Sequence, residues 1–205
     1  MRQTVRYFSM LVALALILAW PAGGAAQTVV GDASAVQATA FGTTSLLGIT
    51  PTTTTVLADT GTLSGIDDVR DASMDVGSVP STLSAEVLSA ATYSYPDEVD
   101  SYSSLGNLEA NVAGVAITAD SVVAQASQVL GASGGGTSYL DNLSINGMPV
   151  AVSGAPNQTI WVPGGQVVIN EQTISPTGTA VVNALHVIVS GVADVVLGSA
   201  TAGIQ

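Results

Sequence analysis

The sequence contains no cysteine and a single histidine, His186. Disulfide bonds and thiolate metal sites are therefore excluded. The absence of cysteine is compatible with any compartment, so it does not locate the protein. A zinc site built on His186 would need carboxylates for its remaining protein ligands, because no second histidine is available.

Basic side chains are almost as scarce. The chain of 205 residues has three basic residues, of which Arg2 and Arg6 lie at the extreme N-terminus, and 15 acidic ones. Residues 27–205 keep only Arg70, so their formal charge is 1 − 15 = −14. Binding to nucleic acids and to anionic membrane surfaces depends on Lys and Arg. We therefore expect neither kind of partner.

Charged residues make up only 9% of the chain and aromatic residues 4%, whereas hydrophobic residues reach 47%. A disordered chain would combine low hydrophobicity with high charge. Val, Leu and Ile are frequent enough to form a core, which must be largely aliphatic because aromatic residues are few. The length fits one domain with small additions.

Residues 1–26 have the pattern of a secretory signal peptide. A short positive stretch, MRQTVR, precedes the apolar run YFSMLVALALILAW, and PAGGAA ends in small residues that fit a cleavage site. The apolar run is shorter than the about 20 residues that span a bilayer comfortably. We expect export with a mature chain that begins near Gln27, and a retained N-terminal anchor is the alternative. No later stretch is expected to span a membrane, since His186 and Asp194 interrupt the apolar region 185–205.

The sequence predicts that residues 27–205 form one all-β domain. Two alternating or Thr-rich stretches favour strands, at 29–42 and 44–61. Residues 81–95 are the best helix candidate in the chain, but their Thr, Ser and Tyr content favours a strand. We expect a polar, acidic connection at 96–107 and one long strand, bent or bulged, at 108–130.

Turn signals are clearest in the hairpin-rich C-terminal part, residues 139–205. Asn146-Gly147 supplies the positive φ angles of a type I′ hairpin turn, and Pro163-Gly164-Gly165 separates two further strand-like runs. Two more strands are predicted at 179–191 and 192–203. Turn signals that recur about every 8–12 residues are typical of a β-sandwich or barrel. We predict a single β-sandwich of antiparallel strands, jelly-roll or Greek-key-like, after the signal peptide.

Four segments in the second half of the chain form a distinctive combination. They are ITADSVVAQAS, LDNLSINGMPVAV, PNQTIWVPGGQVVINEQT and AVVNALHVIVSGVADVVLGSATAGI. Together with SAVQATAFGTTSLLGITPTTTTVL near the N-terminus, they resemble the bacterial surface family called choice-of-anchor P. The likeness is strongest from Ser121 to Ile204 and weakest at 60–105.

The resemblance implies an exported, β-rich surface module from a family whose members carry varied C-terminal anchors. It implies no catalytic activity and supplies no established binding residues. The chain stops at Gln205 without a sorting motif or an anchoring helix. We therefore expect this protein to be released or to be held at the surface non-covalently.

A short glycine-rich stretch matches a hydrolase motif. GASGG, residues 131–135, fits G-x-S-x-G with Ser133 as nucleophile, and Asp141 or Glu171 and then His186 follow in hydrolase order. The motif needs a helix directly after the nucleophile, whereas a loop and a hairpin are expected here. We interpret the match as a chance one and predict no catalytic residue.

Strand alternation explains the setting of His186. Along VVNALHVIV it places His186 on a mixed face with Ala184 and Ile188, and it places Asn183 on the opposite face with Leu185. We interpret His186 as a partly exposed strand residue, not as a catalytic or metal-binding group.

Two acidic clusters are the best signal for a ligand. IDDVRDASMD and PDEVDSYSSLGNLE supply hard oxygen ligands of the kind that Ca²⁺ takes, although neither has the EF-hand spacing. The candidate calcium ligands are Asp67, Asp68, Asp71, Asp75, Asp97, Glu98 and Asp100. The alternative is a pair of solvated acidic loops, and calcium is the only cofactor that the sequence suggests.

The functional expectation follows from export, low charge and the resemblance. We expect a secreted or cell-surface, non-catalytic structural or adhesion module, whose partners are other copies or other surface components. Long strands with few charges leave sheet edges unprotected, so self-assembly into filaments or a matrix by strand addition is one variant. A calcium- or glycan-binding module is the alternative, and a serine hydrolase built on Ser133 is the third. Trp161 is either a platform for carbohydrate or a buried structural residue, and burial is the commoner role of aromatic side chains.

Overall fold

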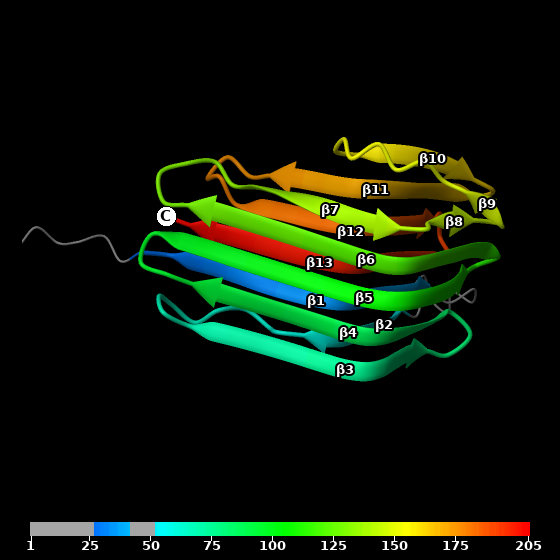
Figure 1. Ribbon diagram of the computed structural model, residues 1–205, viewed down its shortest axis with the longest axis horizontal. Coiled ribbons are helices and arrows are strands. Elements are labelled where there is room, and N and C mark those ends of the chain that lie inside the picture. Colours follow the sequence, from blue (N-terminus) through cyan, green and yellow to red (C-terminus); the bar gives the residue numbers. More distant parts are fainter. Residues whose placement is uncertain (1–26, 42–51) are drawn as a thin grey trace, which may run out of the picture.

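Alternation of apolar and hydroxyl-bearing side chains gives each strand one face that seeks burial, and two such faces pack together. The computed structural model describes residues 27–41 and 52–205, and these form two antiparallel sheets packed as a β-sandwich (Figure 1). This confirms the predicted all-β sandwich. The predicted signal peptide and residues 44–51 of one predicted strand lie outside the described residues. In the described part of the chain, no helix has the length and apolar character needed to cross a membrane.

The first sheet has six strands in the order β10-β11-β12-β13-β1-β2. They are β10 (Gln158–Val162), β11 (Gly165–Ile174), β12 (Ala180–Val189), β13 (Ala193–Ile204), β1 (Val29–Phe41) and β2 (Thr52–Asp59). Consecutive hairpins join β10 to β13, and β1 then pairs with β13. Thr28 and Gln205 exchange two backbone hydrogen bonds of 3.0 Å, so the first described residues lie beside the C-terminus.

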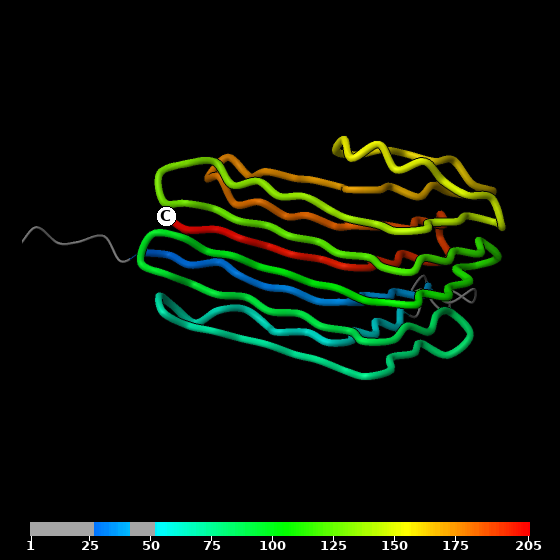
Figure 2. The backbone as a smooth tube through the Cα atoms, viewed as in Figure 1, coloured from blue at the N-terminus to red at the C-terminus, as the bar shows by residue number. Residues whose placement is uncertain are grey.

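The second sheet has seven strands in the order β3-β4-β5-β6-β8-β9, and β7 also pairs with β6. They are β3 (Val69–Val79), β4 (Leu83–Ser94), β5 (Glu98–Val112), β6 (Val115–Val129), β7 (Gly135–Asp141), β8 (Ser144–Ile145) and β9 (Met148–Pro149). β3 to β6 form a meander that can be followed in the backbone trace (Figure 2).

Several local predictions are confirmed. Residues 81–95 contain strand β4 and no helix. Asn146 and Gly147 have φ angles of 51° and 76° between β8 and β9, as a type I′ turn requires. The turn after Pro163 joins β10 to β11, and the two C-terminal strands are β12 and β13.

Two predictions between the acidic loop and the C-terminal hairpins are wrong. Residues 108–130 do not form one strand, because the chain reverses at Ala113 and Gly114, with φ angles of 50° and 91°, between β5 and β6. Residues 96–107 are not a connection, because most of them belong to β5. Two of the inward-facing residues of β5 are serines, Ser101 and Ser103, which conceals its apolar face in the sequence.

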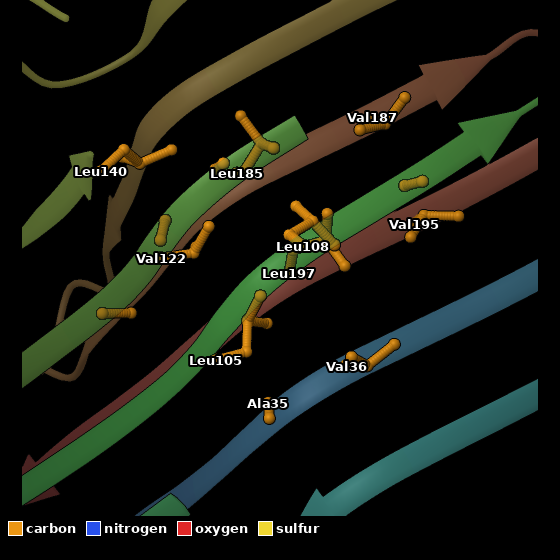
Figure 3. Packing of buried hydrophobic residues seen from close by; sticks show 14 of the residues in the cluster. Ala35, Val36, Leu105, Leu108, Val122, Leu140, Leu185, Val187, Val195 and Leu197 are labelled. Carbon is orange, nitrogen blue, oxygen red and sulfur yellow. The ribbon is translucent and has the colours of Figure 1, made fainter. Parts of the chain in front are cut away.

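Strands β11, β12, β13 and β1 of the six-stranded sheet each contain one place where the alternation of inward- and outward-facing side chains is interrupted. Ala35 and Val36 are neighbours in β1, yet both have 0% exposure and both belong to the core (Figure 3). Ser34 pairs with Ser199 and Val36 pairs with Leu197, so the register is the same on both sides of the irregularity. Because both partner strands change phase together, the apolar residues on either side stay on the core face.

We call this row of irregular positions the slip line. In the six-stranded sheet it consists of Ala58, Ala35, Gly198, Ala184 and Asn170, the residues at which the pairing is interrupted. Three of them have positive φ angles, 46° at Ala58, 72° at Gly198 and 52° at Asn170. The seven-stranded sheet has its own irregular positions, including Val87 with φ 50° and Asn107 with φ 45°.

Side chains from both sheets fill the space between them. Leu105 and Leu108 of β5 lie beside Leu197 of β13 in the core, whereas Leu185 of β12 lies near Val122 of β6 (Figure 3). Many other core residues are alanines, which allow the sheets to approach closely. Ser101 donates a hydrogen bond of 2.6 Å to the backbone oxygen of Thr201, so a direct polar contact also joins the two layers.

Gly198→Ala tests the slip line. An added Cβ would lie 3.3 Å from Cβ of Ala184, and the left-handed φ of 72° disfavours any side chain. A left-handed conformation costs an L-residue about 1–2 kcal/mol, so we expect a loss of this size in the free energy of unfolding measured with urea. Gly65→Ala is the control, because a Cβ there would meet nothing within 4 Å. Equal losses in the two variants would contradict the structural role of Gly198.

Candidate functional site

His186 lies on β12 with a carboxylate at each ring nitrogen. Nδ1 is 2.8 Å from Oε2 of Glu171 on β11, and Nε2 is 2.8 Å from Oδ1 of Asp194 on β13. The side chain of His186 is 14% exposed, compared with 28% for Glu171 and 44% for Asp194. The imidazole therefore joins three neighbouring strands on the outer face of the six-stranded sheet. We call this group the histidine clasp.

Strand register explains why these carboxylates reach the ring. Asp194 is two residues from the β13 residue that pairs with His186, so both side chains share a face. Glu171 is three residues from Val168, the partner of His186 on β11, and would face the core in a regular strand. The change of phase at Asn170 turns Glu171 outward and so completes the clasp.

The same slip line brings Asn183 into the group. Strict alternation predicted Asn183 on the face opposite His186, and this is wrong because the phase of β12 changes at Ala184. Nδ2 of Asn183 donates to Oε2 of Glu171 at 2.7 Å. Oδ1 of Asn183 accepts from the hydroxyl of Ser199 at 2.9 Å. Glu171 is thus held by two donors.

The two carboxylates favour the protonated form of the imidazole. Burial alone would lower the pKa of His186, but the hydrogen bonds to Glu171 and Asp194 and their charges outweigh it and raise the pKa above its usual 6.5. A ring that donates from both nitrogens is an imidazolium. The hydrogen bond from His186 lowers the pKa of Glu171, although burial opposes the shift.

This geometry differs from that of a hydrolase triad, in which one ring nitrogen faces the nucleophile. Ser133 lies in the β6–β7 turn, where the N–H of Gly134 donates to the oxygen of Gly178 at 2.8 Å, just before β12 begins. His186 lies further along β12, about 20 Å from that end at the usual rise per strand residue. Asp141 ends β7 in the other sheet. The structure therefore brings Glu171 to His186 but does not bring Ser133 to either.

The candidate calcium ligands lie on or beside strands β3 to β5 of the seven-stranded sheet. Asp67 and Asp68 lie in the β2–β3 loop, Asp71 and Asp75 on β3, Asp97 in the β4–β5 turn, and Glu98 and Asp100 on β5. Within residues 27–41 and 52–205, no three His, Asp or Glu side chains form a group that could hold a metal ion. Calcium binding by these seven residues stays a prediction.

Asp68 has a local role in the β2–β3 loop. Its Oδ2 accepts hydrogen bonds from the backbone N–H of Ser64 at 2.7 Å, from the hydroxyl of Ser64 at 2.8 Å and from Nε of Arg70 at 3.1 Å. The bonds from Ser64, supported by Arg70, lower the pKa of Asp68 to about 2. This oxygen is therefore engaged within the loop.

Trp161 lies in solvent on edge strand β10, where its exposed fraction is 78%. Its interpretation as a buried structural residue is wrong. β10 is the edge strand of its sheet, so solvent lies both over its outer face and along its unpaired side. Trp161 lies on this strand and pairs with Gln166 of β11. The exposed ring is compatible with the carbohydrate alternative.

Comparison with protein-family models, with curated proteins and with solved structures finds no match to this chain.

The histidine clasp predicts a pH optimum of stability. Because the pKa of His186 is raised, its protonation stabilises the fold fully below pH 6.5. This contribution is lost as the pH rises through the pKa of His186 in the folded state. Because the pKa of Glu171 is lowered, its ionised carboxylate stabilises the fold fully above pH 4.5. This contribution is lost as the pH falls through the pKa of Glu171 in the folded state. We therefore expect the contribution of the clasp to the free energy of unfolding to be largest between pH 4.5 and 6.5.

Urea denaturation of His186→Gln and of the natural protein measures this contribution. Hydrogen bonds to charged groups contribute about 1.5–3 kcal/mol, so the variant should lose about that much near pH 5.5 and less near about pH 8.5. A difference that is the same at both pH values would show that His186 is not held as an imidazolium.

Proposed function

We propose that this protein is an exported, non-catalytic structural or adhesion module of the extracellular space or cell surface, which associates with further copies by strand addition. The open edge of β3 is the observation that carries the proposal. The pattern of residues 1–26 supports export, and the resemblance to the choice-of-anchor P family supports a surface role.

β3 has the properties of an adhesive edge. It ends the strand order of its sheet and pairs with β4. Three of its apolar side chains are exposed, Val69 at 58%, Met74 at 38% and Val76 at 65%. Natural sheets protect long edges with charged side chains, especially lysine, and with prolines, bulges or short strands. β3 has 11 residues, no lysine and no proline, and its charged residues are Arg70, Asp71 and Asp75. Its free backbone edge can therefore accept a strand from a second copy.

Charge opposes this association and makes it dependent on salt. Asp71 and Asp75 lie exposed on β3, and residues 27–205 carry a formal charge of −14. Repulsion between exposed charges is screened over about 10 Å at 0.1 M salt and about 3 Å at 1 M. Assembly should therefore increase with ionic strength.

Sedimentation velocity and negative-stain microscopy of the purified protein test the proposal. We expect assemblies that grow with salt and that Val76→Asp suppresses, because the new carboxylate lies on the edge itself. Val87→Asp is the matched control: it adds the same charge at a 70% exposed valine on β4, an interior strand of the same sheet. Monomers at every salt concentration, or equal effects of the two variants, would contradict strand addition at β3.

The exposure of Trp161 favours glycan binding as a second candidate function. An exposed aromatic ring offers an apolar surface with a polar N–H at its edge, which suits the mixed surface of a sugar. A glycan array that compares the natural protein with Trp161→Ala tests this, and we expect any glycan signal to disappear in the variant. Signals of equal strength would place glycan binding elsewhere.

A further inference from the structure

Four tyrosines lie on or beside the outer face of the seven-stranded sheet, and we call them the tyrosine surface. Tyr93 is the last outward-facing residue of β4, and Tyr95 follows the end of that strand. Tyr102 lies on β5 and Tyr139 lies on β7. Tyr102, Tyr95 and Tyr139 are 39%, 47% and 59% exposed. Buried aromatic residues stabilise a core, but these rings extend over strands β4 to β7 on the side away from the core.

The strand register gives this surface its order. The rings of Tyr93 and Tyr102 lie edge to face, with centroids 6.4 Å apart and an interplanar angle of 66°. Tyr139 pairs with Val123, which pairs with Ser104, two residues after Tyr102 on the same face. The tyrosines therefore run diagonally across the sheet.

Carboxylates lie between and beside the rings. Asp100 pairs with Tyr93 across the β4–β5 ladder, and Asp71 pairs with Ala91, the partner of Tyr102. Burial raises the pKa of Tyr102, and the nearby charges of Asp100 and Glu98 raise it further. The surface thus combines electron-rich ring faces with negative charge.

Within residues 27–41 and 52–205, each side chain that can be positive is already paired. Residues 27–205 contain two side chains that can be positive, Arg70 and His186. Among the described residues, Arg70 pairs with Asp68 and His186 pairs with Glu171 and Asp194. In the described part of the chain, Asp71 and Asp100 beside these tyrosines therefore have no positive partner.

We propose that the tyrosine surface binds an arginine- or lysine-bearing segment of a partner polypeptide. A guanidinium or ammonium group lies favourably over an aromatic ring, and neighbouring carboxylates accept its N–H groups. The negative field of the whole module would draw such a segment in from solution. Residues 27–205 of a second copy do not supply such a segment, because Arg70 is their only lysine or arginine and it pairs with Asp68. The tyrosine surface lies on the outer face of the sheet, whereas strand addition would use the backbone edge of β3, and Asp71 of β3 borders both.

Fluorescence anisotropy with a labelled hexa-arginine peptide and the purified protein tests the proposal. We expect binding that weakens as salt rises. Tyr93→Ser combined with Tyr102→Ser should weaken it at least about fivefold, the effect expected for two exposed cation–π contacts. Tyr102→Phe keeps the ring and should keep the affinity.

Trp161→Ser is the matched control. It removes an aromatic ring that is 78% exposed on the other sheet, beside Gln166 and not beside a free carboxylate. The Trp161→Ser variant should bind hexa-arginine with the same affinity as the natural protein. Thermal melts of all variants exclude unfolding as the cause of a loss.

Three results would overturn the proposal. The tyrosine double variant could bind as tightly as the natural protein, which would indicate attraction to net charge alone. Tyr102→Phe could fall to the level of the serine double variant. Neutral oligosaccharides could bind at these tyrosines without dependence on salt, which would assign the surface to glycans.

Discussion

A strand in a sandwich can change the phase of its alternation without a shift of register only if its neighbours change theirs at the same place. If one strand slipped alone, its apolar residues would turn to solvent while those of its neighbours stayed in the core. The structure meets this constraint with an aligned row, in which Gly198 of β13 lies between Ala35 of β1 and Ala184 of β12. Left-handed conformations at Gly198 and Asn170 suit these residue types. The core, the sheet register and the histidine clasp all depend on this row.

The sequence predicts the architecture well because its signals are local. Alternation identifies most strands, and Asn146-Gly147 and the turn after Pro163 fix two hairpins. It does not predict the slip line, because small apolar residues hide the change of phase. In NALHV, Ala184 followed by Leu185 is compatible with a regular strand, in which a small alanine faces outward. Only the pairing with β11 and β13 shows that both residues face the core.

The same limit explains what was missed at His186. A search for a second histidine, a cysteine or a serine overlooks carboxylates on the flanking strands. The predicted hairpins already imply that β12 lies between the strands that contain Glu171 and Asp194, and this signal could have suggested an ion pair. Regular alternation would still have turned Glu171 inward and separated Asn183 from the ring. The sequence could therefore have predicted that carboxylates flank His186. The full set of contacts in the clasp could not be predicted without the slip line.

The distribution of charge distinguishes the two surfaces for which we propose partners. Both side chains that can be positive in residues 27–205 are engaged by carboxylates of the same chain, so most of the 15 acidic residues have no positive partner among the described residues. At the β3 edge this excess charge repels a second copy, and added salt removes the repulsion. At the tyrosine surface the same charge attracts a basic segment, and added salt removes the attraction. We therefore expect ionic strength to act in opposite directions on the two proposed associations, because one would join like charges and the other opposite charges.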